Sequence, residues 1–104
     1  MPNYSKGKIY KIVDDNDGKI YVGSTTATIN HRLGTHIAHF IQYKKGERHN
    51  QRSYEVLKGG KYHVELIQNY PCSSRNELEA REHYYINTLE CVNKICNKNN
   101  IVLV

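Results

Sequence analysis

Residues 8–23 read KIYKIVDDNDGKIYVG, and this stretch decides the fold. Two runs rich in β-branched and aromatic residues, 8–13 and 19–23, flank a cluster of Asp, Asn and Gly. The runs favour strands and the cluster favours a tight turn, so the sequence predicts a β-hairpin. Folding the hairpin symmetrically about its turn places Tyr10 opposite Tyr21, with both phenol rings on one face.

A helix is predicted to follow the hairpin. Hydroxyl side chains at 24–28 can cap its start. Apolar residues then recur at helical spacing, at Ile29, Leu33, Ile37, Phe40 and Ile41. A second stripe borders this apolar face and consists of Arg32, His36 and His39, each directly before an apolar residue. We expect these cationic side chains to point along the edge of the core toward a cleft.

The second half of the chain predicts two helices and a third strand. Residues 48–58 form a short polar helix with Tyr54 and Leu57 on its buried side. Residues 61–70 alternate as a strand, with Tyr62, Val64 and Leu66 on one face. Ser74 and Glu77 then have the spacing of a capping box. The helix that they open places Leu78, Glu82, Tyr85, Ile86 and Leu89 on one face.

Glu82 is an acid within an otherwise apolar stripe. Burying a carboxylate without a partner costs several kcal/mol or raises its pKa until it is protonated. A bound cation explains this position, and an ion pair with Arg32 or Lys11 explains it equally well.

Composition narrows the class of protein. The chain has 104 residues, 38% of them hydrophobic, which suits one folded domain over 1–104. Lys and Arg outnumber Asp and Glu by 15 to 10, and this favours a polyanionic partner such as nucleic acid. Three cysteines without a CxxC pair argue against a disulfide framework and a zinc site. No apolar run approaches the ~20 residues of a membrane span, and the N-terminus lacks a signal-peptide core. We therefore expect an intracellular protein with no membrane partner.

In two places this sequence resembles the signature of the GIY-YIG nuclease family. The paired tripeptides stand here as Lys8-Ile9-Tyr10 and Tyr21-Val22-Gly23. Lys8 replaces the first glycine of the signature, although Gly7 precedes it, and Val22 replaces an isoleucine. Neither departure touches a reactive group.

The resemblance continues to about residue 97 and covers nearly the whole chain from residue 7. The arginine of the helix that follows the hairpin matches Arg32, with His36 one turn later. The metal-binding glutamate, usually followed by an aromatic residue and an isoleucine, matches Glu82 in EHYYI. The terminal asparagine of many members matches Asn97.

This resemblance implies an α+β fold, a small three-stranded antiparallel sheet flanked by helices. It also implies a metal-dependent DNA endonuclease that hydrolyses a phosphodiester bond one strand at a time. Glu82 would hold a single Mg²⁺, for which Mn²⁺ would substitute, and Arg32 would contact phosphate oxygens. Tyr10 would activate or orient the attacking water, with His36 as the supporting proton acceptor, and Tyr21 would orient the water or a phosphate oxygen.

The remaining positions have supporting roles in the same picture. Gly23 would let the backbone pass close to the substrate, Lys8 would add a phosphate contact, and His39 would bind substrate at the edge of the cleft. Asn97 would fix the geometry of the site through hydrogen bonds.

Two alternatives from another class stay open: a catalytically inactive nucleic-acid-binding module on the same fold, and a small basic protein-interaction domain. Family members are usually steered by an attached DNA-binding region, and no zinc-finger spacing or helix–turn–helix stands outside the core here. The chain is therefore either a catalytic domain from a longer protein or a small nuclease that acts alone, as a monomer or a homodimer.

Overall fold

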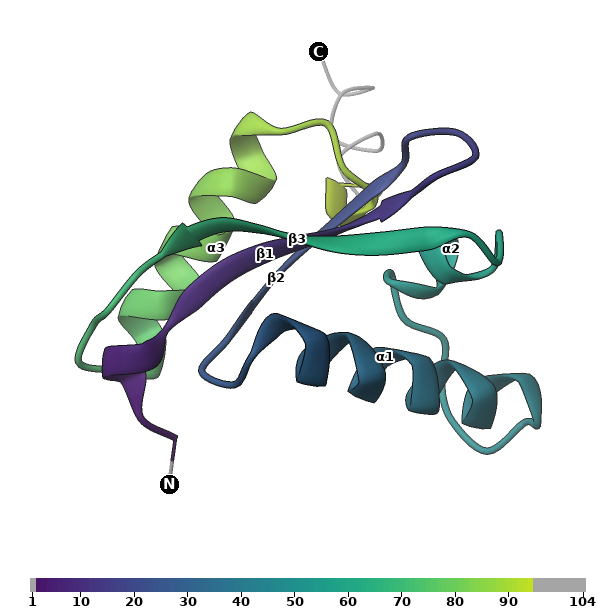
Figure 1. Cartoon of the computed structure of the whole chain (residues 1–104), viewed down its shortest axis with the longest axis horizontal. Coiled ribbons are helices and arrows are strands. Elements are labelled where there is room, and N and C mark those ends of the chain that lie inside the picture. Colours follow the sequence, from purple (N-terminus) through teal and green to yellow (C-terminus); the bar gives the residue numbers. More distant parts are fainter. Residues whose placement is uncertain (1, 95–104) are drawn as a thin grey trace, which may run out of the picture.

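A three-stranded sheet with helices on both faces makes up the computed structural model, which describes residues 2–94 (Figure 1). In chain order the elements are η1 (Tyr4–Lys6), β1 (Lys8–Asp14), β2 (Ile20–Thr25), α1 (Ile29–Lys44), α2 (Tyr54–Leu57), β3 (Tyr62–Asn69), α3 (Arg75–Thr88) and η2 (Val92–Lys94). The expected α+β class is confirmed. Among the described residues, no helix combines the length and apolar character needed to cross a membrane.

β1 is the central strand of the sheet. The order is β2-β1-β3, and both neighbours run antiparallel to β1. Side chains alternate between the two faces of a strand. Tyr10 and Ile12 therefore face α1 and α2, whereas Ile9 faces α3.

The register of the hairpin differs from the expected one by two residues. Tyr10 pairs with Gly23 and Tyr21 pairs with Ile12, so the tyrosines are diagonal neighbours. The reason lies at Asp14, which stays in the strand instead of opening the turn. Its carboxylate is 4% exposed and accepts a hydrogen bond from the Asn16 amide at 2.8 Å. The expectation that both phenols share one face of the sheet is confirmed.

Each face of the sheet has its own hydrophobic cluster. Buried residues between the sheet and α1 and α2 are Tyr10, Ile12, Tyr54, Val56 and Leu57. Those between the sheet and α3 are Ile9, Val22 and Leu78. Figure 1 shows α1 and α3 on opposite sides of the strands. The molecule therefore has three layers, and the edge strand β2 separates the N-terminal ends of α1 and α3.

Caps define both long helices as the sequence predicts. The Thr28 side chain accepts from the His31 amide at the start of α1, and Ser74 accepts from the Glu77 amide at the start of α3. The polar helix expected over 48–58 is wrong in length, because only the four residues of α2 are helical.

Two apolar positions also depart from the expected faces. Leu66 is 45% exposed on the edge strand β3, although it continues the alternation of Tyr62 and Val64 and pairs with Tyr10; the β-bulge between Ile9 and Tyr10 comes only after it. Ile41 is 45% exposed as well, near the C-terminal end of α1.

Candidate active site

A polar cleft of about 450 Å³ lies at the edge strand β2, between the starts of α1 and α3. Both tyrosines of the signature, the arginine of α1 and the glutamate of α3 line this cleft: Tyr10, Tyr21, Arg32 and Glu82. Gly23 and Ser24 of β2 complete its floor. The structure therefore brings together four of the chemically competent residues that the sequence singles out, from both faces of the sheet.

A buried chain of hydrogen bonds runs inward from the cleft. The Tyr10 hydroxyl lies 2.7 Å from His36 Nε2, and His36 Nδ1 lies 3.2 Å from Ser53 Oγ. All three side chains are at most 3% exposed. Burial, together with the smaller effects of the Arg32 and His39 charges, lowers the pKa of His36 to about 4. The imidazole is therefore neutral at neutral pH, and one of its nitrogens can accept a proton.

The Tyr10 phenol is neutral in the same pH range. Burial raises its pKa above the ordinary value of 10.0, and the Arg32 guanidinium partly opposes this by a hydrogen bond and by its charge. Burial likewise raises the pKa of Tyr21, whose ring meets His36 edge-on with centroids 5.3 Å apart. Neither phenol is ionised in the resting site, so Tyr10 can take a proton only while it gives one away.

Gly23 is required by the position of the Tyr10 ring. A Cβ atom at Gly23 would lie 2.5 Å from Cζ of Tyr10, its cross-strand partner. Contacts this short do not occur between carbon atoms in folded proteins, because they lie far inside the van der Waals minimum. The glycine therefore makes room for the phenol. The sequence suggested a different role, close passage of the backbone to substrate.

Glu82 is half-buried on the side of α3 that faces the sheet. Its Oε1 accepts a short hydrogen bond from Ser24 Oγ, at 2.5 Å. Burial raises the pKa of the carboxyl above its ordinary range, and the Ser24 hydroxyl opposes this shift. Among residues 2–94, no cation lies within 4 Å of the carboxylate, and Lys11 pairs with Glu65 instead. An ion pair with Lys11 is thus excluded as the reason for this acid.

The residues around Glu82 suit Mg²⁺ better than they suit a metal ion whose ligands all come from protein side chains. Within the described part of the chain, no three His, Cys, Asp or Glu side chains are grouped as metal ligands. Mg²⁺ retains several waters and is usually bound by one or two carboxylates together with substrate phosphates. A half-buried carboxylate that opens on a polar cleft and has no protein cation beside it fits that pattern.

Three predicted residues lie apart from the cleft or outside the described range. The Lys8 ammonium donates to the carbonyl oxygens of Lys6 and Ala27 at 2.7 and 2.8 Å, and it ties β1 to the loop before α1. His39 lies two helical turns beyond Arg32 on α1, away from the residues that line the cleft. Asn97 lies outside residues 2–94.

Three further residues support the site and were missed from the sequence. Ser24 and Ser53 hydrogen-bond Glu82 and His36, as described above. The Asn93 side chain pairs with both backbone groups of Val22, accepting from its amide at 2.9 Å and donating to its carbonyl at 2.8 Å. A serine after the first helix and an asparagine in the C-terminal segment are too common for their type alone to reveal these contacts.

The α+β fold thus gathers two tyrosines, an arginine and a glutamate around one cleft. Comparison with protein families agrees, because the GIY-YIG catalytic domain matches residues 6–96. The chain belongs to the GIY-YIG family, whose members are nucleases that act on DNA and generally use divalent metals. No curated protein and no solved structure matches it.

Proposed function

We propose that this chain is an active, Mg²⁺-dependent DNA endonuclease that hydrolyses a phosphodiester bond one strand at a time, with its nuclease core at about 7–97. The observation that carries the proposal is the buried hydrogen bond of 2.7 Å between Tyr10 and His36. Tyr10 lines the same cleft as Arg32 and Glu82. A module that only binds nucleic acid has no need of a neutral histidine behind a buried phenol.

Hydrolysis begins with removal of a proton from the attacking water. Tyr10 is the group that touches this water, and its neutral phenol passes its own proton to His36 Nε2 as it accepts the new one. This transfer requires the imidazole tautomer with hydrogen on Nδ1, which can donate to Ser53 Oγ. The relay therefore gives Tyr10 the role of general base without a lowered pKa.

The transition state gains negative charge on the phosphate oxygens. Arg32 is always charged, and its planar guanidinium can donate to two of these oxygens at once. Tyr21 orients the water or a phosphate oxygen from the same face of the sheet. Glu82 would hold Mg²⁺, with Ser24 fixing the orientation of the carboxylate, and the bound ion would neutralise charge on the scissile phosphate and the leaving oxygen.

The test is cleavage of supercoiled plasmid by the protein and by Glu82→Gln. Wild type should nick the plasmid with Mg²⁺ or Mn²⁺, and EDTA should abolish nicking. Glu82→Gln should fold with an unchanged circular dichroism spectrum, because the amide oxygen can still accept from Ser24. Its cleavage rate should fall by ~10²–10³ or more, the usual loss for one transition-state charge contact.

Two results would reject parts of this proposal. Plasmid that stays intact with wild type and either ion would favour the inactive nucleic-acid-binding module. Nicking by Glu82→Gln at the wild-type rate would remove the metal-binding role from Glu82.

A further inference from the structure

Charged residues are distributed unevenly over the three layers. From Gly18 to Gly46 the chain contains no Asp or Glu, and this stretch includes all of α1. α3, on the other face of the sheet, carries Glu77, Glu79 and Glu82. The helix α1 therefore carries positive charge without an acid of its own.

The most basic part of this layer is the exposed segment 44–52, here called the basic loop. Every residue of the basic loop is exposed, and Glu47 is its one acid. Its Lys and Arg residues are Lys44, Lys45, Arg48 and Arg52. Among the described residues, none of these four makes an ion pair within the basic loop or with the rest of the chain. Their charges are thus available to an anionic partner.

Both ends of the basic loop are anchored in the protein. Tyr43, directly before it, stacks on Tyr54 with ring centroids 4.9 Å apart. Ser53, directly after it, is 1% exposed and hydrogen-bonds His36 of the active site. This anchoring limits how far the basic loop can move relative to the cleft, and ordering its cations on a ligand therefore costs less entropy.

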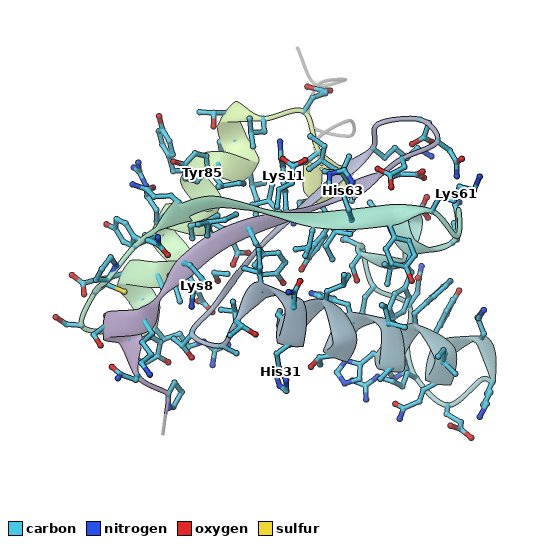
Figure 2. The ribbon with its side chains drawn as sticks, viewed as in Figure 1. Lys8, Lys11, His31, Lys61, His63 and Tyr85 are labelled. Carbon is cyan, nitrogen blue, oxygen red and sulfur yellow. The ribbon has the colours of Figure 1, made fainter. Side chains whose placement is uncertain are left out.

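A stripe on α1 connects the cleft to the basic loop. Arg32 lines the cleft, and His39 follows two turns later on the same face. Arg48 donates to Gln42 at 3.3 Å, and both Arg48 and Arg32 are close enough to His39 to lower its pKa, after the larger effect of burial. Figure 2 shows His31 of α1 pointing away from the sheet, and this side chain is exposed.

We propose that the basic loop and the stripe of α1 that carries Arg32 and His39 bind the phosphate backbone of duplex DNA on one side of the cut. This inference rests on the proposed function, because Arg32 defines the position of the scissile phosphate. The helical rise from Arg32 to Lys44 is ~18 Å. At ~3.4 Å per base pair, the basic loop meets the duplex ~5 base pairs from the cut. A straight helix bordered by cations matches the regular phosphate rows of a duplex better than a flexible single strand.

The first test measures binding, independently of cleavage. Binding of a defined duplex to Glu82→Gln is followed by fluorescence anisotropy over a range of salt, with Arg48→Gln/Arg52→Gln added. Each lost phosphate contact should lower the slope of log K against log salt by ~0.9, so the slope should fall by ~2. The matched control is Lys11→Gln/Lys19→Gln, which removes the same charge from the sheet and the hairpin tip and should leave the slope unchanged.

Three binding results would overturn the proposal. They are an unchanged slope in Arg48→Gln/Arg52→Gln, an equal fall in the control, and an equal loss of affinity for single-stranded DNA. If wild type never cuts but the slopes differ as expected, the proposed function fails and the DNA-binding surface stands.

The second test measures cleavage of duplexes shortened from either end. Cleavage should fall steeply when one flank becomes shorter than ~5 base pairs, and it should tolerate the same loss from the other flank. Equal dependence on both flanks would contradict binding on one side. If wild type cuts and neither test finds the expected asymmetry, the function stands and the basic loop has no part in it.

Discussion

At the scale of single residues, the site depends on contacts that hold one phenol in place. Tyr10 is 1% exposed, with its ring over Gly23 and its hydroxyl on His36. A tyrosine on a strand does not in general need a glycine opposite it. Here the Tyr10 ring lies over its cross-strand partner, which explains why the second tripeptide ends in glycine.

Gly23→Ala should therefore displace the Tyr10 ring. The added methyl cannot fit beside Cζ of Tyr10, and misplacing a reacting group by ~1 Å costs ~10² in rate. The strain should also lower the free energy of unfolding by about 1–3 kcal/mol. Plasmid nicking and urea unfolding measure the two effects. Gly34→Ala on α1 is the control, because its Cβ would meet nothing within 4 Å. Wild-type nicking by Gly23→Ala would show that the ring position is not critical.

Ser53 acts through His36 and is a positioning residue. Ser53→Ala removes the hydroxyl beside Nδ1, so the tautomer that accepts the Tyr10 proton loses its hydrogen-bond partner. We expect kcat to fall about 10- to 100-fold, less than the ~10²–10⁴-fold contribution of a group that itself transfers the proton, with KM unchanged. Ser53→Thr, which keeps the hydroxyl, should recover most of kcat. A rise in KM with constant kcat would instead indicate a change in the neighbouring basic loop.

At the scale of elements, the edge strand β2 is held by more than its ladder to β1. The Asn93 amide of η2 occupies both outward backbone groups of Val22, as a further strand would. An edge strand that is covered in this way is protected from pairing with other chains. It also fixes the strand that carries Tyr21 and Gly23.

Asn93→Ala should loosen this edge. Two hydrogen bonds worth about 1 kcal/mol each are lost, so the free energy of unfolding should fall by about 1–3 kcal/mol. Hydrogen exchange at the Val22 amide should become faster than exchange at Ile12 in the central strand. Asn87→Ala, on the exposed side of α3, should change neither quantity. Unchanged protection of Val22 would mean that η2 contributes little to β2.

Periodicity and capping motifs predicted most of the helices and strands, but these local patterns do not encode long-range contacts. The three strands, α1 and α3 follow from local patterns, and the cleft residues Tyr10, Tyr21, Arg32 and Glu82 follow from the resemblance to the family's ordered motifs. The hairpin register depended on Asp14, whose burial against distant Gly59 no local pattern reveals. The contact between Ser53 and His36 depends on where a loop of nine exposed residues ends, and neither helical nor strand spacing encodes that.

At the scale of the whole molecule, the buried histidine links the proposed chemistry to stability. A neutral imidazole at the junction of β1, α1 and the segment before α2 suits a proton acceptor. Low pH destabilises the same arrangement, because protonation would put a positive charge on the buried His36 ring. His63 differs: it is exposed, and its contacts with Glu65 and Asp15 raise its pKa.

The protein should therefore lose stability as pH falls below about 6.5. The folded pKa of His36 is about 4 and the ordinary value is 6.5, so between these values the unfolded chain binds a proton that the folded chain does not. Stability then rises with pH across this window, and the effect is complete above pH 6.5. At ~1.4 kcal/mol per pH unit, the free energy of unfolding should fall by about 2 kcal/mol between pH 7 and pH 5.

Urea unfolding at the two pH values measures this fall, and the imidazole NMR signals should show His36 still neutral at pH 5. His63→Gln should retain the dependence, since its partners are exposed carboxylates, and His36→Gln should lose most of it. An imidazole of His36 that titrates near pH 6.5 in the folded protein would contradict both the stability argument and the neutral resting state of the relay.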